Sequence, residues 1–291
     1  MNLYCPPTTP PRVLLALDRL EPRIVAGVRR FADERAWILE IPSSYEELLP
    51  RLKDWKGHGL IVDPGNALSR FPLTQVIRQT RVPAVSLHKR GTFLGAARVL
   101  PAYEAIGKVG AEHLVSQGFR ELGLVTFSED LVEEQLWQGM RERCQRHGAA
   151  VRKIAYSDLV EELENADAAI GLLAPTDRKA STVISTCLSN GLELSRQVGV
   201  LGVGDDRKVC RLPDVALSSV ALDYERMGYE AARSLAALMK GQRPERETCE
   251  IAPIGVRGRG SAERSRPGRV DRAPLRQREA NSPRERWASI A

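Results

Sequence analysis

The chain has 291 residues, of which 43% are hydrophobic and 27% are charged; both fractions are usual for globular proteins. This length allows one large domain or two of ordinary size. The net charge of +6 comes entirely from residues 257–291, which hold ten arginines, no lysine and four acidic residues. Residues 1–256 are therefore neutral as a whole, so the basic character of the chain does not indicate a nucleic-acid-binding body.

Simple features of the sequence argue against several classes of protein. No apolar run approaches the roughly 20 residues that a membrane-spanning helix needs. The proline-rich start, residues 1–11, has neither a basic beginning nor an apolar stretch, so no secretory signal is predicted. The five cysteines are widely spaced and form no Cys-x-x-Cys pair. This argues against a disulfide framework or a zinc site and favours a reduced, cytoplasmic setting.

The first hundred residues alternate short apolar runs with amphipathic stretches, which predicts strands alternating with helices. Pro22 lies at the start of the first amphipathic stretch, where proline is well tolerated in a helix. Such repeats predict a parallel sheet covered by helices. The predicted strands are 12–17, 37–41, 59–62 and 82–87, and the predicted helices are 22–36, 45–55 and 73–79.

A second series of the same kind follows a loop that contains Gly91 and Gly95. Its predicted strands are 122–127, 151–156, 168–173 and 198–203, and its predicted helices are 103–117, 133–146, 159–165 and 178–189. The pattern ends with a strand at 215–222, a helix at 224–239 and a strand at 248–256. Because the helix 224–239 has no partner of its own, we expect it to return to the first lobe. The sequence therefore predicts an α/β protein of two lobes.

Motifs for catalysis, metal binding and cofactors are missing. The four histidines stand alone, without the i, i+4 spacing of helical metal ligands. No Gly-x-Ser-x-Gly elbow is present, and the glycine-rich stretch 199–204 departs from Gly-x-Gly-x-x-Gly and lies along a predicted strand. The sequence thus predicts no catalytic residue, no metal and no cofactor. An α/β enzyme remains an alternative that rests on fold class alone.

Polar residues follow several of the predicted strands. In open α/β sheets, ligands bind outside the carboxyl ends of the strands, and carboxylates and hydroxyls there suit the hydroxyl groups of a sugar. Each aspartate taken singly is better explained as a helix N-cap. The candidates for ligand binding at strand ends are Asp18, Asp63, Ser128, Asp177, Asp205 and Asp206.

Several segments together resemble the sensor domain of LacI-type bacterial regulators, which has a periplasmic-binding-protein-like fold. The most specific stretch is 215–221 (VALSSVA) followed by 226–232 (RMGYEAA). The chain is most similar to the xylose operon regulator group, in which the sensor precedes an AraC-type helix-turn-helix domain. The resemblance covers residues 12–256, and its other matching segments are 11–15, 27–32, 105–114, 118–120, 200–203 and 253–256.

The resemblance implies two lobes, each a parallel sheet flanked by helices, around a cleft for a sugar. We expect lobe 1 at about 12–118 plus 223–241 and lobe 2 at about 119–210 plus 246–256. Closure on a xylose-like sugar would reorient attached DNA-binding domains, and the first lobe would form a homodimer. The expected function is ligand sensing in a cytoplasmic transcription regulator, with no membrane contact. The alternative is a solute-binding protein of a transport system, which has the same fold.

Two positions depart from the family's pattern at the expected site. Where the family has an acidic residue before the helix that begins at about 103, this chain has Ala102 and Tyr103, and Tyr103 becomes a candidate aromatic contact for a sugar ring. The strand 201–203 is followed by Gly204, so the expected aspartate comes one place late, as Asp205; Asp177 matches. A lost charged hydrogen bond costs roughly 1.5–3 kcal/mol, so we expect weakened or altered sugar recognition.

The end of the chain is the third departure. Residues 257–291 lack hydrophobic periodicity and are rich in Arg, Ser, Pro and Gly. They cannot bury enough apolar surface to offset an ordering entropy of roughly 1–2 kcal/mol per residue, which predicts a disordered tail. No DNA-binding module is recognisable before Pro11 or after Val256, so DNA contact needs a module not evident in this chain. A change of reading frame after Val256 would also explain the abrupt rise in arginine.

Overall fold

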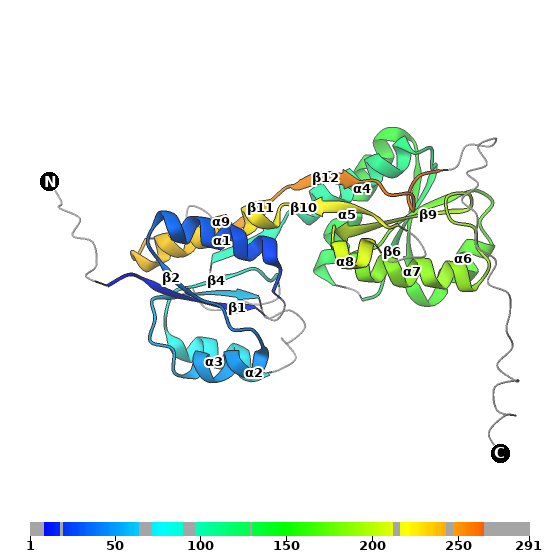
Figure 1. The fold of residues 1–291 in the computed structure, drawn as a ribbon. Helices are drawn as coiled ribbons and strands as arrows, with labels where there is room; N and C mark the ends of the chain where they lie inside the picture. Colours follow the sequence, from blue (N-terminus) through cyan, green and yellow to red (C-terminus); the bar gives the residue numbers. More distant parts are fainter. Residues whose placement is uncertain are drawn as a thin grey trace, which may run out of the picture.

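The computed structural model describes residues 9–17, 20–63, 71–89, 97–128, 130–211, 216–242 and 247–264, and the following account concerns these residues. They form two lobes, each built on a six-stranded sheet (Figure 1). Every strand pairing described is parallel except the one between β10 and β12. The predicted fold class, α/β with two parallel-dominated sheets flanked by helices, is confirmed.

The first lobe has helices on both faces of its sheet (Figure 1). Its strand order is β11 (Thr248–Ile251), β5 (Ala97–Pro101), β4 (Ala84–Ser86), β3 (Gly59–Asp63), β1 (Arg12–Leu17) and β2 (Ile38–Glu40). One face carries α1 (Pro22–Glu34) and α9 (Tyr224–Met239), and the other α2 (Tyr45–Lys53) and α3 (Phe71–Thr80).

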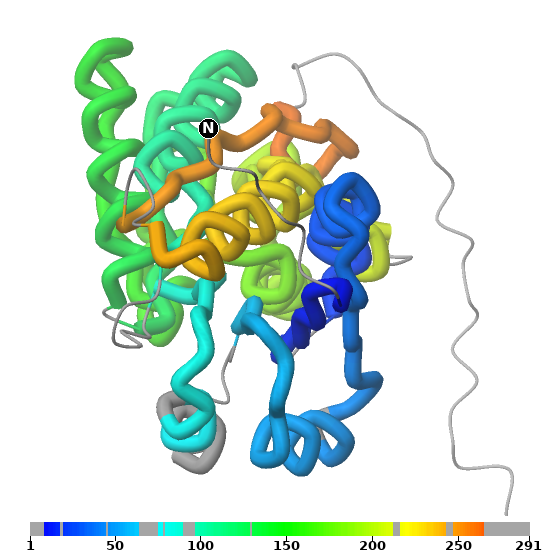
Figure 2. The backbone as a smooth tube through the Cα atoms, turned by 90° about the vertical axis from the view of Figure 1, so that its left-hand side faces the viewer, coloured from blue at the N-terminus to red at the C-terminus, as the bar shows by residue number. Residues whose placement is uncertain are grey.

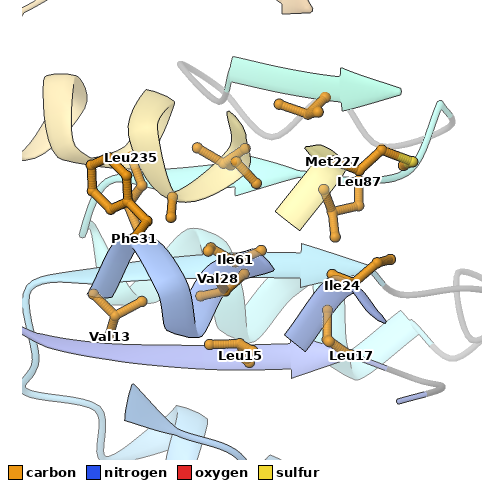
Figure 3. Packing of buried hydrophobic residues seen from close by; sticks show 14 of the residues in the cluster. Val13, Leu15, Leu17, Ile24, Val28, Phe31, Ile61, Leu87, Met227 and Leu235 are labelled. Atoms are coloured by element: carbon orange, nitrogen blue, oxygen red, sulfur yellow. The ribbon is translucent and has the colours of Figure 1, made fainter. Parts of the chain in front are cut away.

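The apolar run of β1 divides its side chains between these two faces, as the twofold period of a strand requires. Val13, Leu15 and Leu17 pack with Ile24 and other apolar side chains of α1 and α9, as Figure 3 shows. The intervening Leu14 packs with α2 and α3. A strand buried on both faces explains why the sequence there shows no polar alternation.

The second lobe repeats this plan. Its strand order is β12 (Pro253–Arg257), β10 (Ser218–Leu222), β9 (Val198–Gly204), β8 (Ile170–Leu173), β6 (Glu121–Thr126) and β7 (Ala150–Ala155). One face is covered by α4 (Tyr103–Ser116) and α5 (Leu131–His147). On the other side lie α6 (Leu159–Glu164), α7 (Asp177–Ser189) and the short α8 (Arg207–Cys210), with a 3₁₀ turn at Tyr156–Asp158.

Two pairs of helices approach unusually closely, one pair in each lobe (Figure 2). In α4 and α5, a Cβ added at Gly107 would lie 2.1 Å from the Leu136 carbonyl oxygen, and one at Gly139 would lie 2.0 Å from the Glu104 oxygen. The pair α1 and α9 shows the same arrangement, with Gly228 facing the Ile24 oxygen at 2.1 Å and Gly27 facing Glu225. Only glycine permits these backbone contacts.

The chain crosses between the lobes three times, and the crossings divide it differently from the expected boundaries. The first crossing lies between β5 and α4, so residues 103–118, expected in lobe 1, belong to lobe 2. The reason is that α4 packs on α5 through Gly107 and the buried Ile106. The expected strand 248–256 is split at Ala252, with β11 in the first sheet and β12 in the second.

The first part of the predicted tail is ordered. Residues 257–264 are folded against lobe 2, where Ala262 is completely buried and Ser261 is 1% exposed. The Ser261 hydroxyl donates to the Val200 carbonyl at 2.6 Å and accepts from the Ser218 amide at 2.8 Å. The prediction of disorder from 257 is therefore wrong for this segment, because the Ser261 hydroxyl completes the hydrogen bonding of β9 and β10. The remainder, 265–291, lies outside the described residues.

Candidate functional site

A cleft of about 800 Å³ lies between the two lobes and is lined from both. Its size falls within the usual range for small-molecule sites, roughly 300–1,000 Å³. The lining residues come from the carboxyl ends of strands and the first turns of helices, as expected for parallel sheets. Those from the first lobe include Glu21, Asp63, His88 and Lys89, and those from the second include Asp130, Glu133, Asp177, Arg178, Lys179 and Asp206.

Two tyrosines stand where the chain crosses between the lobes. Tyr103 begins α4 and Tyr224 begins α9, and both line the cleft. Burial raises the pKa of each hydroxyl above its ordinary value, so both rings stay neutral. A cation of the first lobe lies over each ring, with Lys89 Nζ 5.7 Å from the Tyr103 centroid and the Arg23 guanidinium 4.6 Å from that of Tyr224.

The wall formed by α5 and α7 is held by a buried ion pair. Glu133, 3% exposed, accepts from Lys179 Nζ at 2.9 Å and from the backbone amides of Phe127 and Ser128 at 3.2 Å each. Lys179 Nζ also lies 4.7 Å from the Phe127 ring centroid. Glu133 is the buried member of this pair, and losing its three donors would leave a buried carboxylate without partners.

Asp177 supports the neighbouring wall from within. Its Oδ1 accepts from the Ser219 hydroxyl at 2.5 Å and its Oδ2 from the Asp206 amide at 2.6 Å. Burial raises its pKa, an effect that these hydrogen bonds oppose. A Cβ on Gly202 would lie 2.4 Å from Asp177 Oδ1, so β9 needs glycine at this point. The carboxylate is thus committed largely to holding the end of β9.

The backbone after β9 turns sharply, and this changes which aspartate reaches the cleft. Gly204 and Asp205 have φ angles of 129° and 55°, in the left-handed region. Asp205 is 8% exposed and pairs with Arg259, so it does not line the cleft. Asp206, one residue later, does line it, while its Oδ1 caps α8 by accepting from the Lys208 amide at 3.0 Å.

The sequence-predicted site residues are therefore only partly brought together. Asp63, Tyr103, Asp177 and Asp206 line the cleft. The exposed Ser128 and the buried Asp205 do not line it, and Asp18 lies outside the described residues.

Sequence reasoning missed several cleft residues, among them Lys89, Lys179 and Tyr224. For Tyr224 a signal existed, because Tyr-Glu-x-x-Gly occurs at 103–107 and again at 224–228. Both copies begin a helix at a crossing between the lobes. The lysines carry no comparable mark, since their long side chains reach the cleft only through the tertiary fold.

Ala102, singled out in the sequence analysis, lies at the start of α4. It occupies the N-cap position of α4 and makes no side-chain capping hydrogen bond. At the equivalent point of α9, the Asp223 carboxylate accepts from the Arg226 amide at 3.0 Å. The two crossings thus differ in how firmly the first turn of the following helix is held.

The described part of the chain shows no metal centre, and three of its buried thiols are held protonated. No group of three or more His, Cys, Asp or Glu side chains there is placed to hold a metal ion. Burial raises the pKa of Cys144 and Cys187 to about 11 and that of Cys210 to about 12, which keeps these thiols protonated. No described helix is long and apolar enough to span a bilayer.

Comparison with known proteins agrees with this geometry. Residues 111–262 match the family model described as the periplasmic binding protein-like domain. The xylose operon regulatory protein of Escherichia coli K12 is 23% identical over 280 residues, covering 85% of this chain and 67% of that protein. A Haemophilus influenzae protein of the same name is 28% identical over 105 residues, covering 36% of this chain and 27% of its own length.

Solved structures share the fold. The xylose-binding transcription activator xylR superposes with a TM-score of 0.70 at 19% identity, covering 89% of this chain and 71% of that one. The transcriptional regulator CelR in its cellobiose complex superposes with a TM-score of 0.65 at 20% identity, covering 86% and 84%. At these identities the likeness concerns the arrangement of the two lobes.

Proposed function

The chain belongs to the family of periplasmic binding protein-like domains, and from this membership we propose that it is the sugar-sensing domain of a transcription regulator. The observation that carries the proposal is the interlobe cleft, whose 800 Å³ combine two tyrosine rings with several carboxylates. Aromatic faces and hydrogen-bond acceptors are the groups that a sugar ring and its hydroxyls require. The names of the E. coli relative and of the xylR structure favour a xylose-like sugar.

In this proposal, the residues of the cleft either contact the sugar or hold the cleft wall in place. Asp63 from lobe 1 and Asp206 from lobe 2 accept hydrogen bonds from sugar hydroxyls, and Tyr103 and Tyr224 supply apolar faces for the ring. Asp177 contributes mainly by holding the wall, as do Ser128 and Asp205. A sugar that contacts both lobes stabilises the closed arrangement over an open one, which shifts the population toward closure.

Regulation of transcription would then depend on parts beyond the two lobes. The match to the E. coli relative covers 67% of that protein, so a third of it lies outside the comparison. We propose that the regulator binds DNA through an AraC-type helix-turn-helix module outside the two lobes. We also propose that it works as a homodimer in the cytoplasm. The two-lobed domain itself binds its ligand without catalysing a reaction. The alternative of a transport protein is not favoured, because the curated relatives found are regulators.

Isothermal titration calorimetry tests the sugar proposal. The purified chain is titrated with D-xylose, D-ribose, L-arabinose and cellobiose, and binding of a pentose is expected. Asp63→Asn should weaken that binding roughly tenfold or more, because it removes one charged hydrogen-bond acceptor. The matched control is Arg30→Gln, which breaks an exposed ion pair with Glu225 away from the cleft. No heat with any of the sugars from a folded protein would count against the proposal.

A further inference from the structure

Two contacts bridge the lobes at the cleft, and each uses a long cation of lobe 1. Arg23 on α1 donates through Nη2 to the carbonyl oxygens of Gly204 at 3.3 Å and Asp205 at 3.4 Å. Lys89 donates through Nζ to the Leu131 carbonyl at 3.0 Å and also bonds Gln135. These bonds exist only while the lobes are close together. Closure of the lobes therefore adds the Arg23 hydrogen bonds to residues 204–206, which we call the Gly204 turn.

The Gly204 turn is fastened to lobe 2 at several points. The Asp205 amide donates to the Ser219 hydroxyl at 3.0 Å, and the Asp206 amide donates to Asp177. The remaining fastening is the ion pair between the Asp205 carboxylate and Arg259, whose side chains are 11% and 20% exposed. Since this pair is mostly shielded from water, its bonds are stronger than those of a surface ion pair.

Arg259 belongs to the segment through which the described chain leaves lobe 2, residues 257–264, which we call the exit segment. The Arg259 amide donates to the Ser218 hydroxyl at 2.8 Å, and Arg259 Nη1 donates to the Leu217 carbonyl at 3.0 Å. Further along, the Ser261 carbonyl accepts from the Val200 amide at 2.7 Å. The exit segment is thus hydrogen-bonded to β9 and β10, the strands whose carboxyl ends lie at the cleft.

We propose that Arg259 is a positioning residue that links the Gly204 turn to the exit segment. When the lobes close, Arg23 binds the Gly204 turn, and Arg259 transmits this change to the exit segment. The inference rests on the proposed function for its biological meaning. The displaced aspartate gives it a physical basis: the extra residue Gly204 turns Asp205 away from the cleft and toward Arg259.

Hydrogen exchange with mass spectrometry tests this coupling in the full chain without a ligand. The reporters are the amides of Asp205 and Asp206 in the turn, and those of Arg259 and Val200 at the exit segment. Arg23→Gln removes the bonds from lobe 1 to the Gly204 turn, together with the ion pair to Glu21 and the contact with the Tyr224 ring. We expect it to speed exchange at all four reporters, by roughly tenfold at the turn, the equivalent of one charge-assisted hydrogen bond.

Variants at the pair itself complete the test. Asp205→Asn and Arg259→Gln should each speed exchange in the turn and in the exit segment, and the double variant should add little to either, because both break the same link. The control Arg30→Gln, on the same helix as Arg23, breaks a contact within lobe 1 and should leave the four reporters unchanged. Arg259→Lys keeps the charge but loses the fork, and should fall between wild type and Arg259→Gln.

The outcomes separate this inference from the proposed function. Faster exchange at the turn but not at the exit segment in Arg23→Gln overturns the coupling, as does an equal effect of Arg30→Gln. Titration with D-xylose is a separate arm. If no sugar binds and the exchange pattern holds, the sensor proposal fails and the coupling stands; if D-xylose binds but Arg23→Gln leaves the exit segment unchanged, the reverse is true.

Discussion

The close approach of α4 and α5 makes opposite predictions for two glycines of the same helix. Alanine is the better helix former by about 1 kcal/mol, so Gly→Ala on α4 should stabilise the protein wherever space allows. At Gly107 there is no space, since the new Cβ would lie 2.1 Å from the Leu136 carbonyl oxygen. At Gly110 the nearest atoms are the Leu173 methyls at 3.2 Å, and a side chain can shift.

The magnitude follows from how far the helices must move. Bringing the Gly107→Ala contact even to 3.0 Å needs a displacement of about 0.9 Å, because a backbone oxygen cannot rotate away. A gap of that size forfeits up to half of the dispersion energy of the separated atoms. Overpacking of this kind costs about 3 kcal/mol, the upper part of its usual range. Subtracting about 1 kcal/mol for helix propensity leaves a net loss of about 2 kcal/mol.

Urea unfolding followed by circular dichroism measures both variants against wild type. Gly107→Ala should lower the free energy of unfolding by about 2 kcal/mol, whereas Gly110→Ala should change it by between zero and about +1 kcal/mol. Gly228→Ala, which faces the Ile24 oxygen in the other lobe, should behave like Gly107→Ala. A Gly107→Ala protein as stable as Gly110→Ala would refute the close-packing argument.

Three further predictions concern capping, acid stability and the cleft. Ala102→Asp should restore the missing N-cap of α4 and raise the unfolding free energy by about 1 kcal/mol in urea melts; no gain would mean that another group already satisfies the helix end. Burial lowers the pKa of His113 below its ordinary 6.5, and its Nε2 has no described partner, so the unfolded chain binds the proton more readily and stability falls as pH drops below 6.5. His113→Gln should flatten this loss in thermal melts between pH 7 and about 5. Tyr103→Leu should weaken D-xylose binding in calorimetry while leaving the unfolding midpoint within a few degrees of wild type; unchanged affinity would remove Tyr103 from the site.

Strand periodicity was enough to predict the two-lobed α/β plan but not the path of the chain between the lobes. Buried strands such as β1 and β9 stand out as apolar runs between turns. β5 was missed because Arg98 interrupts its apolar run and Pro101 ends it. The assignment of α4 to the wrong lobe has a different cause: position along the chain does not say which sheet a helix covers, and the packing of Gly107 decides it.

The site was predicted only as far as strand ends reveal it. Asp63 ends β3 and Asp177 begins the helix that follows β8, so the rule for parallel sheets found them. Arg23 and Lys89 escaped it because their role is to reach across from one lobe to the other, and no local pattern encodes that distance. The arginine content of the final residues led to the prediction of disorder from residue 257, yet Ser261 and Ala262 are buried. Single small residues can pack against a sheet without any hydrophobic periodicity in the sequence.

The two departures from the family's pattern have different structural consequences. At 102 the acidic group is absent, and Ala102 makes no side-chain capping hydrogen bond to α4. At Gly204 the backbone adopts a left-handed φ. As a result the Asp205 carboxylate pairs with Arg259, and Asp206 lines the cleft instead. The carboxylate that the sequence analysis expected from Asp205 is therefore supplied to this wall by Asp206. Sugar recognition should accordingly be weakened at the Ala102 side and kept at the Asp206 side, while the Asp205 position serves the exit segment.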